Sequence, residues 1–434
     1  MDSIRNIVSW RKNLLKSRLS RNITMAVSST ALAQGITIAI SPLLTRLYTT
    51  TDLGIFAVYN STLIILSVLT SLRYELTVPL PKEDSEAANL LTLSMILLPI
   101  TAAIVACFIP FTEESIIHLT DEPGLRPFLS WLAPGLIVVG AYQALSYWFL
   151  RRLDFGPIAS SKSIQSLIQG TIHILLGIFV GGAIGLLAGL LLGYLIGSLW
   201  FIFLILKKDR LMLKSVNPQK IWSLALKYKH FPLISSGSAI LNNIGIQLPV
   251  YIFTVFFDAR VVGLFALTQR VINVPISILS GSIGQVFTSE AAHLATESPQ
   301  ALLSLFNQMT KRLFFLSLIP ATIFALIGPP LFALVFGEEW REAGTYASLL
   351  MPLIIARFVV SPAGQVFNVL ELLNFQLVWD TVRFVVLAAT LVLVARKGDA
   401  VFTIGAYSIT LTVLYSALYL VYRRVIFKLS VTDG

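Results

Sequence analysis

The stretch that decides the fold is GLFALTQRVINVPISILSGSIG, residues 263 to 284. It lies in a run of about twenty-five mostly apolar residues, 261–285, whose single charge is Arg270. A helix needs roughly 20 apolar residues to cross a hydrocarbon core about 30 Å thick. The run therefore predicts a membrane-spanning helix that carries an arginine well inside it.

The composition of the chain extends this interpretation to its whole length. The 434 residues are 56% hydrophobic and only 12% charged, and the mean hydropathy is +0.81. Soluble domains are about 45–50% apolar and about one quarter charged. The composition thus indicates a polytopic membrane protein. The single cysteine, Cys107, excludes a disulfide framework within the chain.

Twelve apolar segments are long enough to be spans, and each is expected to be helical because lipid offers no partner for unpaired backbone groups. The fifth and sixth are separated only by Gly181 and Gly182. The predicted spans are 22–44, 54–72, 86–109, 127–150, 157–180, 183–206, 231–257, 261–285, 313–336, 345–370, 374–395 and 401–422.

The loop charges predict the orientation of these spans. If the N-terminus is cytoplasmic, the inside segments hold 22 lysines and arginines and the outside loops hold 6. The positive-inside rule then places both termini in the cytoplasm. It also explains the net charge of +10 without nucleic-acid binding. The basic lead-in, 1–21, is predicted to be an amphipathic segment on the inner leaflet.

The two halves of the chain repeat each other. Three short matches occur in the same order, pairing Ser28-Ser29 with Ser235-Ser236, Pro42 with Pro249, and GIFAV (54–58) with GLFAL (263–267). An even number of spans per repeat keeps both halves in one orientation, so we expect a pseudo-two-fold axis along the membrane normal. The predicted fold is all-α, with twelve transmembrane helices in two pseudo-symmetric six-helix bundles around a central cavity.

The predicted domains follow from this repeat. They are the lead-in 1–21, the N-terminal bundle 22–206, a basic cytoplasmic linker 207–230, the C-terminal bundle 231–422 and a cytoplasmic tail 423–434.

Polar side chains recur every three or four residues along the first, seventh and eighth spans. Gln34, Asn242 and Asn273 belong to these three stripes. Such a stripe faces one side of a helix, where it lines a cavity or lets neighbouring helices pack closely. Since all three stripes fall on spans predicted to border the interface of the two halves, we take these three residues as candidate cavity residues.

Four ionisable residues lie deep within predicted spans, and such residues are functional candidates. At 1.5 Å per residue, Arg270 lies about 14 Å and Arg357 about 18 Å below the outer face. Asp380 and Arg383 are three residues apart and are expected to form an ion pair, whose role is either structural or in ion coupling. Arg357, at similar depth, is an alternative partner of Asp380. Arg270 has no carboxylate within a turn of its own helix, so an anionic substrate is expected near it.

Enzymatic chemistry finds little support in the sequence. No phosphate-binding loop motif occurs, and the four histidines, His118, His173, His230 and His293, are scattered without the spacing of a metal site. The longest predicted connection, about 286–312, is short for the active site of a membrane transferase. We therefore expect a transporter with no metal and no cofactor.

Two N-terminal stretches carry a family resemblance. LTRLYTTTDLGIFAVYNS (44–61) and SLRYELTVPLPKEDSEAANLL (71–91) resemble the signatures of Wzx-type O-antigen flippases. These belong to the polysaccharide transport branch of the multidrug/oligosaccharidyl-lipid/polysaccharide exporter superfamily. Arg46, Arg73 and Glu75 stand at the positions of the family motif, where simpler roles are interfacial anchoring for Arg46 and a salt bridge for the other two.

The resemblance implies that the chain flips an undecaprenyl-diphosphate-linked oligosaccharide from the cytoplasmic to the periplasmic leaflet of a bacterial inner membrane by alternating access. Arg270 matches the cationic cavity of such flippases. Proton or sodium coupling, a polysaccharide polymerase and a chain-length regulator as partners, and a monomeric state are expected with it. A small-molecule or drug antiporter of the same fold is the alternative function.

Overall fold

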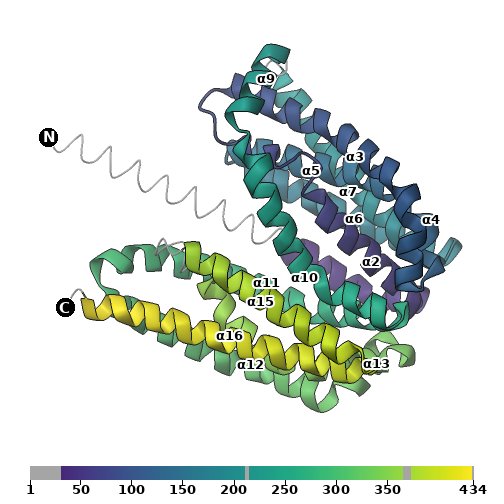
Figure 1. Ribbon diagram of the computed structural model, residues 1–434, viewed down its shortest axis with the longest axis vertical. Coiled ribbons are helices and arrows are strands. Elements are labelled where there is room, and N and C mark those ends of the chain that lie inside the picture. Colours follow the sequence, from purple (N-terminus) through teal and green to yellow (C-terminus); the bar gives the residue numbers. More distant parts are fainter. Residues whose placement is uncertain (1–30, 211–214, 365–372, 433–434) are drawn as a thin grey trace. The chain divides into compact units, whose positions relative to one another are not determined.

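The computed structural model describes residues 31–210, 215–364 and 373–432 (Figure 1). The predicted lead-in, 1–21, lies outside them. Within the described ranges the chain is helical and contains no strand. The main helices are Ala31–Leu47, α2 Thr50–Ser67, α3 Asp84–Thr120, α5 Leu132–Arg151, α6 Phe155–Phe179, α7 Gly182–Lys208, α9 Pro218–Lys227, α10 Ser236–Phe256, α11 Ala259–Glu297, α12 Pro299–Phe336, α13 Arg341–Val360, α15 Leu373–Ala395 and α16 Ala400–Thr432.

The membrane class predicted from composition is confirmed. Among the described residues, nine helices are long and apolar enough to cross a bilayer. The helix Ala31–Leu47 is apolar but shorter. The number twelve, which also counts α2 and α6, stays a prediction.

The chain divides into two compact units. Unit 1 comprises Met1–Ile40, Tyr59–Ile117 and Pro123–Ile244, and unit 2 comprises Ser41–Val58, His118–Glu122 and Gly245–Gly434. Helices α2 and α10 therefore contribute residues to both units, so the units do not follow the boundaries of the two sequence repeats.

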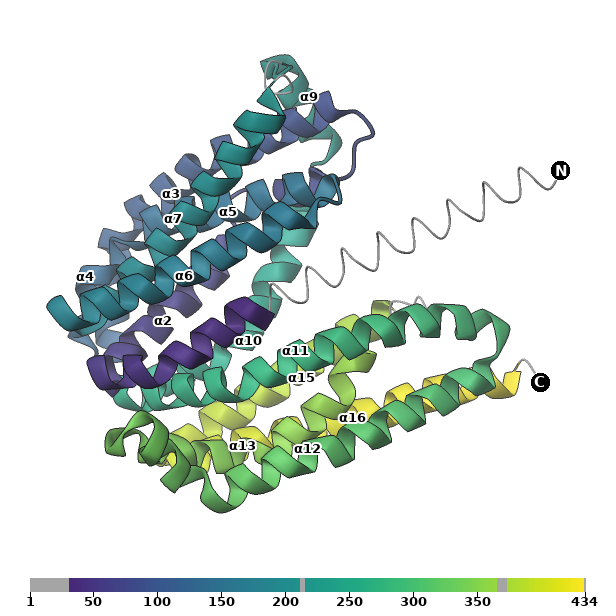
Figure 2. The ribbon, with the colours of Figure 1, turned by 180° about the vertical axis from the view of Figure 1, so that it is seen from behind.

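Unit 1 contains α5, α6 and α7 side by side (Figure 2). The break between α6 and α7 falls where the sequence predicted it, because Gly181 and Gly182 have φ angles of 70° and 66°, which side chains rarely tolerate. On α7, Gly189 and Gly193 face α6 so closely that a Cβ would lie 2.2 Å from the His173 ring and 2.8 Å from the Gln165 carbonyl oxygen. Small residues thus permit the close approach typical of membrane helices.

The segment predicted as a basic linker, 207–230, contains the helix α9. Asn217 caps its first turn by accepting a hydrogen bond from the Gln219 amide at 2.8 Å. Leu224 is buried in the same core cluster as Trp148, and the Tyr74 hydroxyl donates to the Ala225 carbonyl oxygen at 2.9 Å. Ten residues of the predicted linker thus form a short amphipathic helix that covers the end of unit 1.

Unit 2 contains α12, α13 and α16 side by side. The ends of α11 and α12 form the connection predicted at 286–312, and only Ser298 separates the two helices. Both helices continue beyond the apolar run because Phe287 and Phe306 pack in one buried cluster. Likewise α16 runs to Thr432 through the predicted tail, and Ile426 is buried in that cluster.

Candidate functional site

The first turns of α11 are fixed against α2 within unit 2. A Cβ on Gly263 would lie 1.8 Å from the Thr50 carbonyl oxygen, and a Cβ on Gly54 would lie 1.8 Å from the Ala259 carbonyl oxygen. No side chain fits in either place. Further along α11, Thr268 donates to the Ala343 carbonyl oxygen of α13 at 2.9 Å. The part of α11 that carries Arg270 is thus held between two helices.

Arg270 is half-buried on α11. Within the described ranges its guanidinium has no ion pair and no hydrogen bond. A guanidinium in an apolar surrounding costs several kcal/mol when nothing compensates it. The position therefore favours an anion or water beside it.

A second cation reaches the same part of α11. The Arg357 guanidinium of α13 donates from Nη1 to Asn273 Oδ1 at 3.1 Å. Asn273 in turn donates from Nδ2 to Gln269 Oε1 at 2.7 Å. Since residues three apart are neighbours on a helix, Asn273 lies next to Arg270. The Arg357 guanidinium of α13 therefore contacts a residue that lies within one turn of Arg270 on α11.

The deep carboxylate does not neutralise these cations. Arg383 donates to Asp380 at 3.2 Å within α15, as the spacing predicted. Arg357 binds Asn273 and forms no ion pair with Asp380 within 4.0 Å, so the alternative of a shared carboxylate is not realised. The Asp380–Arg383 pair is half-buried.

Tyr407 of α16 was missed by the sequence analysis. Its side chain is buried, lies within electrostatic range of both Arg357 and Arg383, and packs edge-on against Phe265 with ring centroids 5.9 Å apart. Arg270, Asn273, Arg357 and Tyr407, here called the arginine cluster, come from α11, α13 and α16. A single tyrosine in an apolar span cannot be identified as a site residue from sequence. Whether it faces lipid, another helix or a cavity depends on how the helices pack.

The remaining candidate cavity residues belong to unit 1. Gln34 is half-buried on the helix Ala31–Leu47, and Asn242 is exposed on α10. Arg46 lies in unit 2 and is exposed near the end of the helix Ala31–Leu47. None of the three is in the arginine cluster.

The motif residues Arg73 and Glu75 form the salt bridge that the sequence offered as their simpler role. Arg73 Nη1 lies 3.7 Å from Glu75 Oε1, and the Ser71 hydroxyl donates to Glu75 Oε2. Leu72 and Arg73 have φ angles of 50° and 64°, a strained conformation for residues with side chains. This turn lies between α2 and α3, and Glu75 follows the end of the predicted span 54–72. Burial raises the pKa of Glu75, although the Ser71 hydrogen bond and Arg73 oppose the shift.

The described part of the chain contains no group of three or more histidine, cysteine or acidic residues able to hold a metal ion. The arginine cluster offers hydrogen-bond donors and positive charge. Such groups can bind an anion, for which the planar guanidinium is well suited.

A comparison with known protein families finds a match. Residues 43–345 match the family described as polysaccharide biosynthesis protein. A comparison with curated proteins finds no match.

Solved structures share the fold at low identity. A multidrug resistance MATE family transporter of the MOP superfamily, in an inward-facing conformation, is 14% identical over 95% of this chain and 99% of its own, with a TM-score of 0.70. The lipid II flippase MurJ in an inward closed conformation is 14% identical over 96% of this chain and 90% of its own, with a TM-score of 0.60. A Vibrio cholerae MATE transporter is 12% identical over 96% and 98%, with a TM-score of 0.58.

The family match covers more than half of the chain, and the fold agrees with the twofold-repeated helical architecture expected from the sequence. The chain therefore belongs to the polysaccharide biosynthesis protein family, and it shares its fold with the MATE family transporter and with the lipid II flippase MurJ.

Proposed function

We propose that this chain flips an undecaprenyl-diphosphate-linked oligosaccharide, such as an O-antigen repeat unit, from the cytoplasmic to the periplasmic leaflet of a bacterial inner membrane. Membership of a polysaccharide biosynthesis family and the fold shared with a lipid II flippase support a lipid-linked substrate. The direction, from the cytoplasmic to the periplasmic leaflet, is what the resemblance to Wzx-type flippases implies.

The observation that carries the proposal is the unneutralised charge of the arginine cluster. Arg270 has no partner among the described residues, and Arg357 is held by a neutral amide. A diphosphate presents several anionic oxygens, and guanidinium groups bind such oxygens through two parallel hydrogen bonds. The cluster would therefore bind the diphosphate of the substrate in a water-filled cavity.

The barrier to flipping is the transfer of a polar headgroup through hydrocarbon, which costs several kcal/mol for every polar group without a hydrogen bond. A cavity lined by Gln34, Asn242 and Asn273 would replace the lost water while the prenyl tail stays in lipid. Movement of one six-helix repeat against the other would open the cavity first to one leaflet and then to the other. Coupling to protons or sodium, and cooperation with a polymerase and a chain-length regulator, belong to this proposal.

A complementation experiment tests the proposal. A strain without the gene would receive the wild-type chain, Arg270→Ala, or the control Arg260→Ala. Arg260 is exposed on the same helix and is paired with Glu342 at 2.7 Å, so its loss costs little. We expect surface polysaccharide to be restored by the wild-type and control chains only. With Arg270→Ala, the lipid-linked repeat unit should accumulate while the protein level stays normal.

The same strains distinguish the drug-antiporter alternative, which shares the fold. The proposal would be contradicted if the wild-type chain changed drug susceptibility but left the polysaccharide absent. Full export by Arg270→Ala would contradict the role proposed for the arginine cluster. It would not contradict the proposed substrate, a lipid-linked oligosaccharide.

A further inference from the structure

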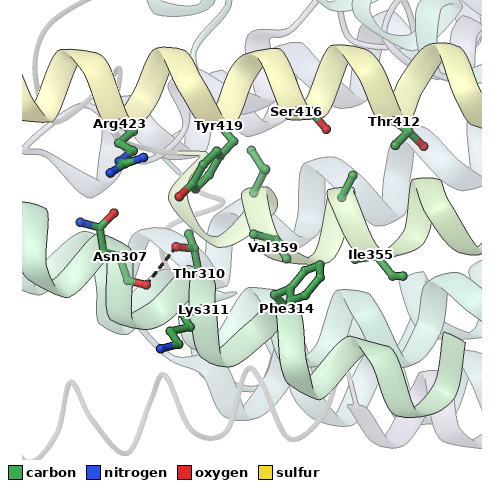
Figure 3. Close-up of a pocket in the computed structure, with 12 residues that line it drawn as sticks. Asn307, Thr310, Lys311, Phe314, Ile355, Val359, Thr412, Ser416, Tyr419 and Arg423 are labelled. Carbon is green, nitrogen blue, oxygen red and sulfur yellow. Dashed lines mark hydrogen bonds between the residues drawn. The ribbon is translucent and has the colours of Figure 1, made fainter. Parts of the chain in front are cut away.

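A cavity of about 560 Å³ opens between α12, α13 and α16 of unit 2 (Figure 3). Among the residues whose side chains the structure describes, none from α11 or α15 lines it, and Arg270, Asn273, Asp380 and Arg383 are not part of its wall. Its volume falls within the range of about 300–1,000 Å³ that is usual for sites of small ligands. Its lining residues are Asn307, Thr310, Lys311, Phe314, Ile355, Ala356, Val359, Val360, Thr412, Ser416, Tyr419 and Arg423.

One end of this cavity is cationic. Lys311 of α12 and Arg423 of α16 lie there with Asn307 between the two helices (Figure 3). Both cations are exposed, and neither forms an ion pair or a hydrogen bond within the described residues. Two unpaired cations converging from separate helices create a local preference for an anion.

The rest of the cavity is largely apolar. Val359 and Phe314 lie next to the charged end, and Ile355 lies further from it (Figure 3). The Phe314 side chain is 43% exposed. Contact of this apolar surface with water is unfavourable, and contact with hydrocarbon is favourable. The hydroxyl groups of Thr412 and Ser416 also line this part. A ligand with negative charge at one end and hydrocarbon at the other matches most of the lining.

We propose that this cavity binds an anionic diacyl phospholipid from the surrounding leaflet. The phosphate lies between Lys311 and Arg423, and an acyl chain extends along Phe314, Val359 and Ile355. Basic pockets between transmembrane helices bind the headgroups of anionic lipids in this manner. The positive-inside count places this end of α12 and α16 at the cytoplasmic face, so the lipid belongs to the inner leaflet. The site does not depend on the proposed function.

Native mass spectrometry of the purified full-length protein tests the site. Phosphatidylglycerol and phosphatidylcholine with the same acyl chains would be added separately and together. We expect phosphatidylglycerol to bind in preference, and the double variant Lys311→Gln/Arg423→Gln to weaken its binding about tenfold or more. The matched control is Arg312→Gln/Arg424→Gln. It removes two exposed cations from adjacent positions of the same helices that do not line the cavity, and it should retain binding.

Two further measurements identify the source of the phosphate. Ala356→Phe would fill the apolar part of the cavity and leave both cations in place, and it should also abolish preferential binding in protein that remains monodisperse. Glycerol 1-phosphate at millimolar concentration should not displace phosphatidylglycerol, because it lacks the acyl chains. Equal loss in the two double variants, equal binding of the two lipids, or displacement by glycerol 1-phosphate would each overturn the proposal.

Discussion

Gly54 and Gly263 occupy equivalent positions of the two sequence repeats, and each packs on the helix that carries the other. Gly263 faces the carbonyl oxygen of Thr50, four residues before Gly54. Gly54 faces the carbonyl oxygen of Ala259, four residues before Gly263. Thr50 and Ala259 are also equivalent in the two repeats, so the two contacts are copies of each other. A two-fold axis produces such a reciprocal pair of contacts. The crossing of α2 and α11 thus preserves the symmetry that the sequence repeat predicted.

This crossing makes the first prediction. Gly263→Ala places a methyl group where a carbonyl oxygen would lie at 1.8 Å, so the helices must separate and the fold should lose about 1–3 kcal/mol of stability. Gly54→Ala should have the same effect. Thermal unfolding in detergent measures it. Gly281→Ala, on the same helix as Gly263, is the control, because a Cβ on Gly281 would meet no atom within 4 Å. Equal melting temperatures for Gly263→Ala and Gly281→Ala would disprove the close approach.

The hydrogen bond between Arg357 and Asn273 makes the second prediction. Asn273→Asp keeps the shape of the side chain but adds a carboxylate beside Arg357, which would compete with an anionic substrate. Asn273→Ser removes the amide without adding charge. We expect polysaccharide export to fall further with Asn273→Asp than with Asn273→Ser, by several-fold. If the aspartate variant exported as well as the wild-type chain, positive charge at this place would have no role in transport.

The ion pair between Asp380 and Arg383 makes the third prediction. Asp380→Asn leaves Arg383 without its carboxylate, and an unpaired charge inside the membrane costs several kcal/mol. If the pair only stabilises the fold, Asp380→Asn/Arg383→Gln should restore the protein level that the single variant loses. We expect that rescue in protein abundance. Loss of export in both variants at normal abundance would instead assign the pair to ion coupling.

The buried Glu75 makes the fourth prediction. Burial raises its pKa above the ordinary value, so the folded protein binds this proton more tightly than the unfolded chain does. The stabilisation is complete below the unfolded pKa and is lost as the pH rises through the folded pKa. Thermal unfolding should show stability falling with rising pH in that window. Glu75→Gln should flatten this dependence and keep the hydrogen bond from Ser71. A variant with the unchanged pH dependence would show that another group titrates.

Much of the fold could be predicted from sequence where one physical signal dominates. Gly181 and Gly182 marked the α6–α7 turn correctly because an apolar run can reverse there only with positive φ angles. The ion pair between Asp380 and Arg383 was predicted from their spacing of three residues on one helix. The helices of 286–312 and α9 were missed because hydropathy finds membrane spans and overlooks amphipathic helices outside them.

The candidate site was only partly predictable. Arg270 was identified by its charge alone, since any ionisable residue in an apolar run is conspicuous. The contact of Arg357 with Asn273 depends on how α13 lies against α11, which no periodicity encodes. Tyr407 and the cavity between α12, α13 and α16 arise from tertiary packing in the same way.

The central claim is that Arg270 binds the diphosphate of a lipid-linked oligosaccharide during flipping. The most direct test measures transbilayer movement of that lipid in proteoliposomes containing wild-type, Arg270→Ala or Arg270→Lys protein. Losing a charge-assisted hydrogen bond costs about 1.5–3 kcal/mol, so the rate should fall about ten- to a hundredfold with alanine and partly recover with lysine. Movement by Arg270→Ala at the wild-type rate would contradict the account.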